Sequence, residues 1–406
     1  MPLKSWITRP QRRLGAVGFV ALLVLGSLIT PLSLDMYTPA VPHMVDHFAT
    51  TEAVVNLTLV GYFLFFAVGL LLFGPASDKY GRRPVLLGGA AAYAAGGAAC
   101  ALSPTIEVLI AARIVQALGA GAISAVATAT VKDAVANERR ELMLSIVQVM
   151  FVVGPVLAPV MGALILQVAD WRMTFWVLAA FGLLCTLLAL LFEETLPPEE
   201  RERGSMFTSL RNLGRVARGR GFSAFLAIVG TFNLPFMAYI AVGSYIYIEF
   251  FGLSEIGYSL YFAFAAIVTV AGPFIWLMAQ RFMSVRRYTT GLIVVGIVAG
   301  VAMLLVGQRT PLLFCVTFLV FALTEASVRP YSTNILLDQQ EGDTGAAASL
   351  INFAHTVLGC VGMFAAVLPF ANYVQAVGWI MIATMAAALV GWLALLRSRI
   401  PLKGVK

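Results

Sequence analysis

Twelve apolar runs, each long enough to cross a lipid bilayer as one helix, constrain the fold of this chain more than any other feature. A spanning helix needs about 20 predominantly apolar residues. Composition agrees, because 60% of the 406 residues are apolar and only 12% are charged, whereas soluble domains carry about 25% charged residues. The sequence therefore predicts an all-α integral membrane protein with twelve transmembrane helices. The runs lie at residues 14–40, 53–74, 84–102, 107–131, 142–167, 173–192, 222–248, 257–279, 288–307, 311–336, 345–370 and 374–396.

One long hydrophilic segment, residues 193–221, separates the sixth apolar run from the seventh. It predicts an N-terminal six-helix bundle over 1–192, a cytoplasmic linker over 193–221 and a C-terminal six-helix bundle over 222–406. Each half also carries a basic turn between its second and third helices. This repeated basic turn indicates two pseudo-symmetric bundles, as in membrane proteins built from internal repeats.

The basic residues gather in alternate connections between the apolar runs. Placing both termini in the cytoplasm assigns 23 of the 27 Lys and Arg residues to cytoplasmic segments and leaves only Arg172 and Arg309 in outer loops. Cytoplasmic loops are enriched in Lys and Arg, so we expect both termini to be cytoplasmic. Membrane orientation also accounts for the net charge of +7, and no nucleic-acid partner is expected.

Several function classes have no support in the sequence. It contains no metal-spaced set of His and Cys, no nucleophile motif and no phosphate-binding loop, and no extramembrane segment exceeds about 30 residues. The four cysteines lie in separate apolar runs without CxxC spacing, which supports neither a disulfide framework nor a zinc site. We expect no enzyme activity, no receptor domain, no cofactor and no metal site.

The turn after the second helix, from Gly74 to Arg83, has an unusual pattern. Gly74 and Gly81 permit a tight turn close to a neighbouring helix, and Asp78 is suited to accept hydrogen bonds from the amides of a helix N-terminus. A solvated basic turn explains Arg82 and Arg83 but not the acid or the glycine spacing.

An acidic partner for Arg82 is available at the cytoplasmic end of helix four. Asp133 would form with Arg82 a cluster that holds one conformation shut and releases it in another. The alternative is a helix-end charge that pairs with its neighbour Lys132.

Two charged residues lie inside apolar runs of the first half. Arg113 lies about two turns from the outer end of helix four, where an intramembrane charge is a functional candidate, unless it extends to the outer interface. Asp35 lies in the outer half of helix one. A carboxylate removed from water holds a proton more firmly, which makes Asp35 a candidate proton carrier with Arg113 as its coupling partner. The alternative is an interfacial aspartate that faces water.

Helix five combines small residues with proline. Gly154 and Gly162 permit close helix contact, and Pro159 removes a backbone hydrogen bond and bends the helix. A bend with a tight seam suits a bundle that does not leak protons. Ordinary transmembrane packing is the alternative, since Gly and Pro are common in such helices.

Helix ten carries Glu325 and Arg329 on one face, four residues apart. They form either a structural ion pair or part of a binding surface, in which Glu325 is a second proton site and Arg329 contacts substrate. Polar and aromatic residues in the middles of other helices are further candidates for substrate contact: Tyr37, Tyr62, Asn233 and Tyr239.

These motifs resemble those of one family. Residues 74–83 match the G-x3-D-x2-G-R-R signature of the major facilitator superfamily at every defining position. Residues 113–119 resemble its R-x2-Q-G-x-G motif, and 154–163 resemble the G-x3-G-P-x2-G-G signature associated with its antiporters, with alanine replacing some glycines. Residues 34–42 resemble the drug:proton antiporters with twelve helices, especially the bicyclomycin and chloramphenicol resistance branch.

The resemblance implies two bundles that rock about a central cavity in the bacterial inner membrane. The expected function is proton-coupled efflux of a small amphipathic drug or metabolite by a monomer, driven by the proton gradient. The partners would then be the small-molecule substrate, protons and the lipid bilayer. The alternative is a symporter or facilitator for a polar metabolite, with Arg329 holding an anionic group.

Overall fold

The computed structural model describes residues 6–9, 11–201, 213–339, 344–398, 400 and 402–405. Twelve helical stretches in this part of the chain are long and apolar enough to cross a membrane, which confirms the all-α fold and each predicted span. Contacts divide the chain into two units, Met1–Met206 and Phe207–Lys406. The boundary falls within the segment 193–221.

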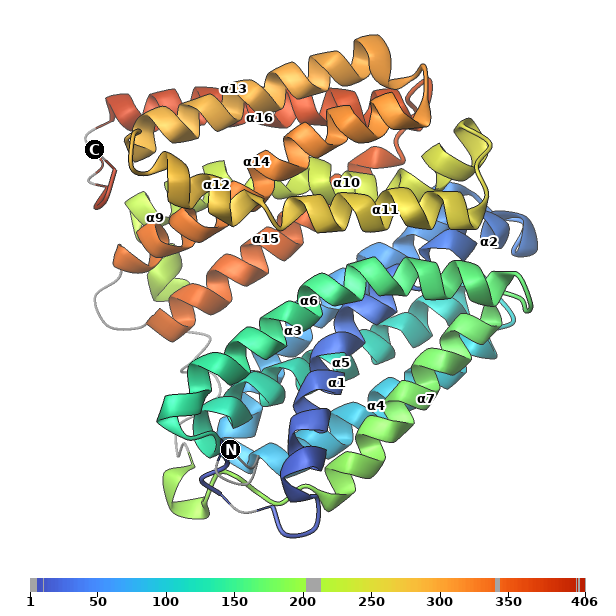
Figure 1. The fold of residues 1–406 in the computed structure, drawn as a ribbon, viewed down its shortest axis with the longest axis vertical. Helices are drawn as coiled ribbons and strands as arrows, with labels where there is room; N and C mark the ends of the chain where they lie inside the picture. The colour runs from blue at the N-terminus through green and yellow to red at the C-terminus, as the bar shows by residue number, and fades with distance from the viewer. Residues whose placement is uncertain are drawn as a thin grey trace. The chain divides into compact units, whose positions relative to one another are not determined.

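The first unit, drawn in blue to green, is a bundle of six spans (Figure 1). Helix α1 packs against α6, α5 and α7, and α4 packs against both α5 and α7. The helices of this unit are α1 (Gly15–Asp35), η2 (Thr38–Ala40), α2 (Val41–His47), α3 (Glu52–Tyr80), α4 (Arg82–Ala101), α5 (Ile106–Ala134), α6 (Asn137–Leu166) and α7 (Arg172–Leu191), with the short η3 (Pro198–Glu200) after them.

The second unit, drawn in yellow-green to red, holds the other six spans (Figure 1). Helix α10 packs against α15, and α13 packs against α16 and α14. The elements of this unit are α9 (Arg220–Gly230), α10 (Asn233–Ser244), η4 (Tyr245–Phe250), α11 (Glu255–Thr269), α12 (Gly272–Ala279), α13 (Val285–Ala302), η5 (Met303–Gly307), α14 (Pro311–Asp338), α15 (Thr344–Ala366) and α16 (Tyr373–Arg397).

Several spans are built from more than one helical piece. The first span extends to His47 rather than ending near residue 40, because Pro39 and Pro42 begin new helical segments at η2 and α2. Proline suits a first turn, where its missing N–H leaves no bond unmade.

Helix α6 begins at Asn137, five residues before the predicted start at 142. Its 30 residues make it about 45 Å long, which exceeds a hydrocarbon core of about 30 Å.

Candidate functional site

Arg113 lies at the centre of a polar cluster inside the first unit, and its side chain is fully buried. The guanidinium Nη1 donates to Oε1 of Gln116 at 2.8 Å, and Nη2 donates to the backbone oxygen of Ser33 at 2.9 Å. The rings of Tyr37 and Tyr62 lie 4.5 and 4.1 Å from the guanidinium carbon. Helix α5 therefore directs Arg113 into the bundle, and the alternative of extension to the outer interface is wrong.

The end of α1 explains why a buried cation is tolerated here. The last four carbonyls of a helix lack intrahelical partners and lie at the negative end of its dipole. Helix α1 ends at Asp35, so the Ser33 carbonyl belongs to this set and accepts from Arg113. Among the described residues no carboxylate forms an ion pair with Arg113. Its charge is balanced by the helix end and by three aromatic faces, because the Phe175 ring also lies 5.6 Å from the guanidinium carbon.

Asp35 lies at the same helix end and is only 4% exposed. Its backbone oxygen accepts a hydrogen bond from Thr38 Oγ1 at 2.8 Å. Its carboxylate makes no hydrogen bond or ion pair with any residue that the structure describes. Arg113 and Asp35 share one helix end, because Arg113 binds the carbonyl of Ser33, two residues before Asp35 in α1, and the influence of Arg113 on Asp35 stays a prediction.

The motif glycines Gly154 and Gly162, which lie on α6, pack against this part of α1. A Cβ at Gly154 would meet the side chain of Pro31, and a Cβ at Gly162 would meet the backbone oxygen of Met36. The predicted close contact through small residues is present, and its partner is the segment that carries Asp35. Pro159 lies inside the continuous helix α6, between the two glycines.

The turn between α3 and α4 forms a network centred on Arg82, which is 5% exposed. Its guanidinium pairs with Asp78 at 2.6 Å and with Asp133 at 2.7 Å, and it donates to Ser77 Oγ at 2.6 Å. The pairing of Arg82 with Asp133 is therefore confirmed as a contact. Arg83 lies at the edge, where its Nη2 donates to the Leu190 carbonyl at 2.9 Å.

The capping role expected of Asp78 belongs instead to Glu194, a residue that the sequence analysis missed. Glu194 Oε1 accepts from the backbone amide of Arg82 at 2.9 Å, and Oε2 accepts from that of Arg83 at 3.1 Å. These are the first amides of α4, where a carboxylate is favoured by the helix dipole. No pattern marks Glu194 among the acids of the linker.

The two motif glycines of this turn differ in their surroundings. Gly81 has φ +102°, a conformation that favours glycine, and a Cβ there would meet the Glu194 carboxylate. Around Gly74 the described residues leave open space, so its expected close approach to a neighbouring helix is absent from the described part of the chain.

The N-terminal segment is fastened to the same end of the first unit. Gln11 exchanges two hydrogen bonds with the backbone of Glu193, of 3.0 and 2.8 Å. Ile7 forms an isolated β-bridge with Val135, at the junction of α5 and α6. Arg9 forms an ion pair of 2.9 Å with Glu200.

A second polar cluster lies inside the second unit, where α10, α14 and α15 meet. Arg329 Nε donates to Glu325 Oε1 at 2.9 Å, and Arg329 Nη2 contacts Asn233 Oδ1 at 3.4 Å. Asn233 Nδ2 in turn donates to the backbone oxygen of His355 at 2.5 Å. The Glu325–Arg329 ion pair predicted from their four-residue spacing is present.

Most of the candidate substrate contacts are enclosed in this structure. Tyr37 and Tyr62 flank Arg113 and have no exposed surface, and Asn233 is 1% exposed. Tyr239 stacks on Phe318 with ring centroids 3.8 Å apart and is 3% exposed. Of the predicted substrate contacts, Arg329 alone has a side chain with a substantial exposed surface.

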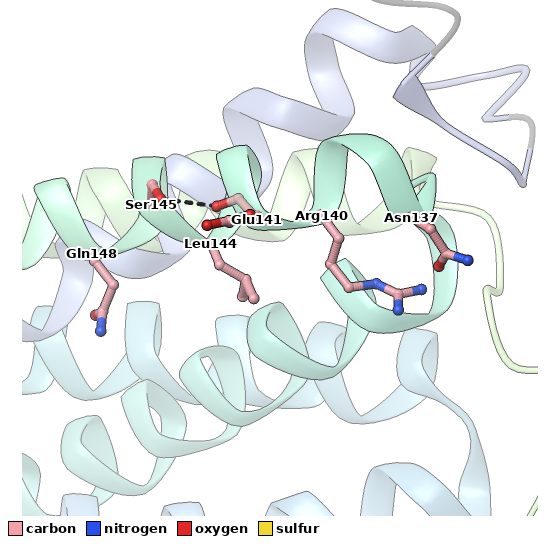
Figure 2. Close-up of a pocket in the computed structure, with 6 residues that line it drawn as sticks. All are labelled: Asn137, Arg140, Glu141, Leu144, Ser145 and Gln148. Atoms are coloured by element: carbon pink, nitrogen blue, oxygen red, sulfur yellow. Dashed lines mark hydrogen bonds between the residues drawn. The ribbon is translucent and has the colours of Figure 1, made fainter. Parts of the chain in front are cut away.

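A surface hollow follows one face of the first half of α6 (Figure 2). Its lining residues recur along one face of the helix, and all but one are polar: Asn137, Arg140, Glu141, Leu144, Ser145 and Gln148. Ser145 Oγ donates to the backbone oxygen of Glu141 at 2.9 Å. Because α6 is longer than the hydrocarbon core, its first turns can extend beyond the lipid, where polar side chains meet water or headgroups.

Twelve candidate spans in two units, with a charged cluster in each, are the architecture of a multi-pass membrane protein. The chain belongs to the Major Facilitator Superfamily, whose family model matches residues 23–363. Its family and fold are those of membrane transporters rather than of enzymes.

Relatives by sequence include proteins from several bacteria. The chain is 29% identical to the uncharacterized MFS-type transporter YdgK of Bacillus subtilis over 343 residues, which cover 82% of this chain and 85% of YdgK. It is 33% identical over 244 residues to a chloramphenicol resistance protein of Pseudomonas aeruginosa, covering 60% of this chain and 57% of that protein. It is 33% identical over 171 residues to the multidrug resistance protein MdtL of Escherichia coli, covering 42% and 44% respectively.

Solved structures share the fold at low sequence identity. A D-xylose-proton symporter matches with a TM-score of 0.71 at 16% identity, covering 95% of this chain and 98% of that one. A bacterial homologue of the human lysosomal transporter Spinster, in an inward-facing and occupied conformation, matches with a TM-score of 0.74 at 14% identity, covering 95% and 97%. These similarities establish the major facilitator fold.

Proposed function

We propose that this transporter exports a small amphipathic drug or metabolite across the bacterial inner membrane in exchange for protons. The observation that carries the proposal is Asp35, a buried carboxylate without a partner among the described residues, at the end of a helix that Arg113 caps. The relatives named for chloramphenicol and multidrug resistance support a drug-like substrate.

In this mechanism, Asp35 takes up and releases the transported proton. A buried carboxylate with no compensating cation is costly when it is charged, so its protonation state is sensitive to its exposure to water. Arg113 holds the Ser33 carbonyl in the same helix turn. Movement of α1 that changes the exposure of Asp35 is therefore coupled to α5 through the contact of Arg113 with the Ser33 carbonyl.

The turn between α3 and α4 acts in this proposal as a conformational latch. Arg82, at the start of α4, contacts α3 through Ser77 and Asp78 and α5 through Asp133. Glu194 ties the start of the segment 193–221 to the same turn. Such a network stabilises one arrangement of the cytoplasmic ends of the helices. Its release would permit the opposite arrangement, with the segment 193–221 as a cytoplasmic linker between the two units.

The proposal is tested with the purified full chain in proteoliposomes. An imposed proton gradient should drive accumulation of a drug against its concentration gradient, and collapse of the gradient with an ionophore should abolish it. Susceptibility profiling of efflux-deficient bacteria that express the chain selects the drug. Transport that is indifferent to the gradient contradicts antiport. Accumulation in which drug and protons move in the same direction identifies a symporter instead.

A further inference from the structure

A charged side chain is exposed about two-thirds of the way along a spanning helix of the second unit. Arg329 lies 18 residues after Pro311, where α14 begins, or roughly 27 Å along a helix about 42 Å long. Its side chain is 52% exposed, whereas that of its partner Glu325 is 8% exposed. A charge that faces lipid at such depth is costly, and intramembrane charges face the bundle interior or a water-filled cavity. The exposed surface of Arg329 is therefore suited to a hydrated path rather than to lipid.

The hydrogen-bonding edge of this guanidinium is incompletely used. Nε donates to Glu325 at 2.9 Å, and Nη2 has only a long contact of 3.4 Å with Asn233. Nη1 donates to no acceptor in the described part of the chain. The edge formed by Nη1 and Nη2 is the one that matches a carboxylate in a bidentate arrangement.

Two buried side chains fix the orientation of that edge. Asn233 is 1% exposed and is itself held by the His355 carbonyl on α15. Glu325 is also buried and engages the opposite side of the guanidinium at Nε. A guanidinium oriented before binding loses less conformational freedom when a ligand arrives.

We propose that Arg329 binds a carboxylate group of the transported molecule through its Nη1 and Nη2 edge. The inference rests on the proposed transport function and names the substrate class, an amphipathic monocarboxylate. Glu325 positions Arg329 and balances its charge in the absence of substrate. A cationic group fits less well, because Glu325 lies behind the guanidinium and is already paired.

Binding of matched probes to the purified full chain in detergent tests the assignment. Three probes share one ring system and differ in charge: biphenylcarboxylate, biphenylcarboxamide and biphenylmethylammonium. Charge-assisted hydrogen bonds are stronger than neutral ones, so the carboxylate should bind about tenfold or more tightly than the carboxamide near neutral pH. The double variant Glu325→Gln/Arg329→Gln buries no unpaired charge, and the ratio of its affinities for the carboxylate and the carboxamide should fall to about one.

Arg309→Gln is the matched control, since Arg309 is exposed outside the spans and its loss should leave the preference intact. Equal affinities of wild type for carboxylate and carboxamide, no measurable binding of the carboxylate, or tightest binding of the ammonium probe would each overturn the assignment. So would a carboxylate preference that survives in the double variant. The measurement uses no proton gradient, so its failure leaves proton-driven transport standing, and failure of gradient-driven transport leaves the binding result standing.

Discussion

At the scale of single residues, Arg113 and Arg329, the two arginines that the predicted apolar runs enclose, have opposite environments. Arg113 is fully buried and caps a helix end, whereas the Arg329 side chain is 52% exposed and pairs with an acid. Both were predictable as candidates, because a charge in an apolar run is conspicuous. Their partners were not equally predictable. The Glu325 pairing follows from helical spacing, but the Ser33 carbonyl is a backbone group without a sequence signature.

Replacing Asp35 with asparagine tests its assignment as the proton carrier. Asn cannot release a proton, so Asp35→Asn should reduce accumulation against a gradient by about tenfold or more, while substrate binding stays measurable and varies less with pH. The measurement combines proteoliposome uptake with binding at several pH values. Asp46→Asn is the matched control, because Asp46 is exposed at the end of the same span.

Glu325→Gln separates the two candidate carriers in the same assays. If Glu325 on α14 carries the proton, this variant rather than Asp35→Asn removes the pH dependence. Normal accumulation by both variants would contradict a carboxylate carrier at either position.

At the scale of elements, the seam between α1 and α6 depends on two glycines. Gly162→Ala adds a methyl group where the Met36 carbonyl lies, and a backbone atom yields less readily than a flexible side chain. Overpacking of this kind costs about 1–3 kcal/mol, more than the helix propensity of alanine returns. We therefore expect a lower midpoint of thermal unfolding in detergent, together with reduced transport.

Gly88→Ala is the control for that substitution. Gly88 lies on the exposed side of α4, where a methyl group would meet open space, so alanine should be neutral or stabilise by up to about 1 kcal/mol. Equal thermal midpoints for Gly162→Ala and Gly88→Ala would contradict the tight seam.

Glu194 caps α4 and orders the start of the segment 193–221. Removing its carboxylate leaves the amides of Arg82, Arg83, Thr195 and Leu196 without their acceptor. Water can replace part of this interaction, because the side chain is 24% exposed. We expect Glu194→Ala to cost about 1–2 kcal/mol, read as a lower thermal midpoint. Glu194→Gln, which keeps an acceptor, should recover part of the loss, and Glu199→Ala at an exposed acid should have little effect. A midpoint unchanged in Glu194→Ala would refute the cap.

The twelve spanning helices were predictable from the sequence, whereas the residues at which they begin and end were less predictable. Apolar length identified each of the twelve spans, since lipid demands about 20 apolar residues whatever their order. The start of α6 at Asn137 was missed because its first turns are polar and carry no apolar signal. The extension of the first span to His47 was missed because proline can either follow the end of a helix or begin a new one, and Pro39 and Pro42 do the second.

At the scale of the whole molecule, the duplicated bundle and the charge asymmetry are separate signals. The six-plus-six pattern gives the fold without its direction in the membrane. The placement of Lys and Arg gives direction, since 23 of the 27 fall on one side in the proposed orientation. The network of Arg82, Asp133 and Glu194 then lies at the cytoplasmic ends of the first unit.

Reporter fusions test this orientation directly. A reporter that is active only in the cytoplasm, fused after Lys406 or inserted within residues 193–221, should be active at both positions, because Lys and Arg are retained on the cytoplasmic side during insertion. The same reporter inserted beside Arg172, in the connection between α6 and α7, should be inactive, and one that requires the periplasm should show the reverse pattern. Periplasmic activity after Lys406 or within 193–221 would invert the orientation. It would also place the network around Arg82 on the outer side of the membrane. That placement would contradict the proposed gating at the cytoplasmic ends of the helices.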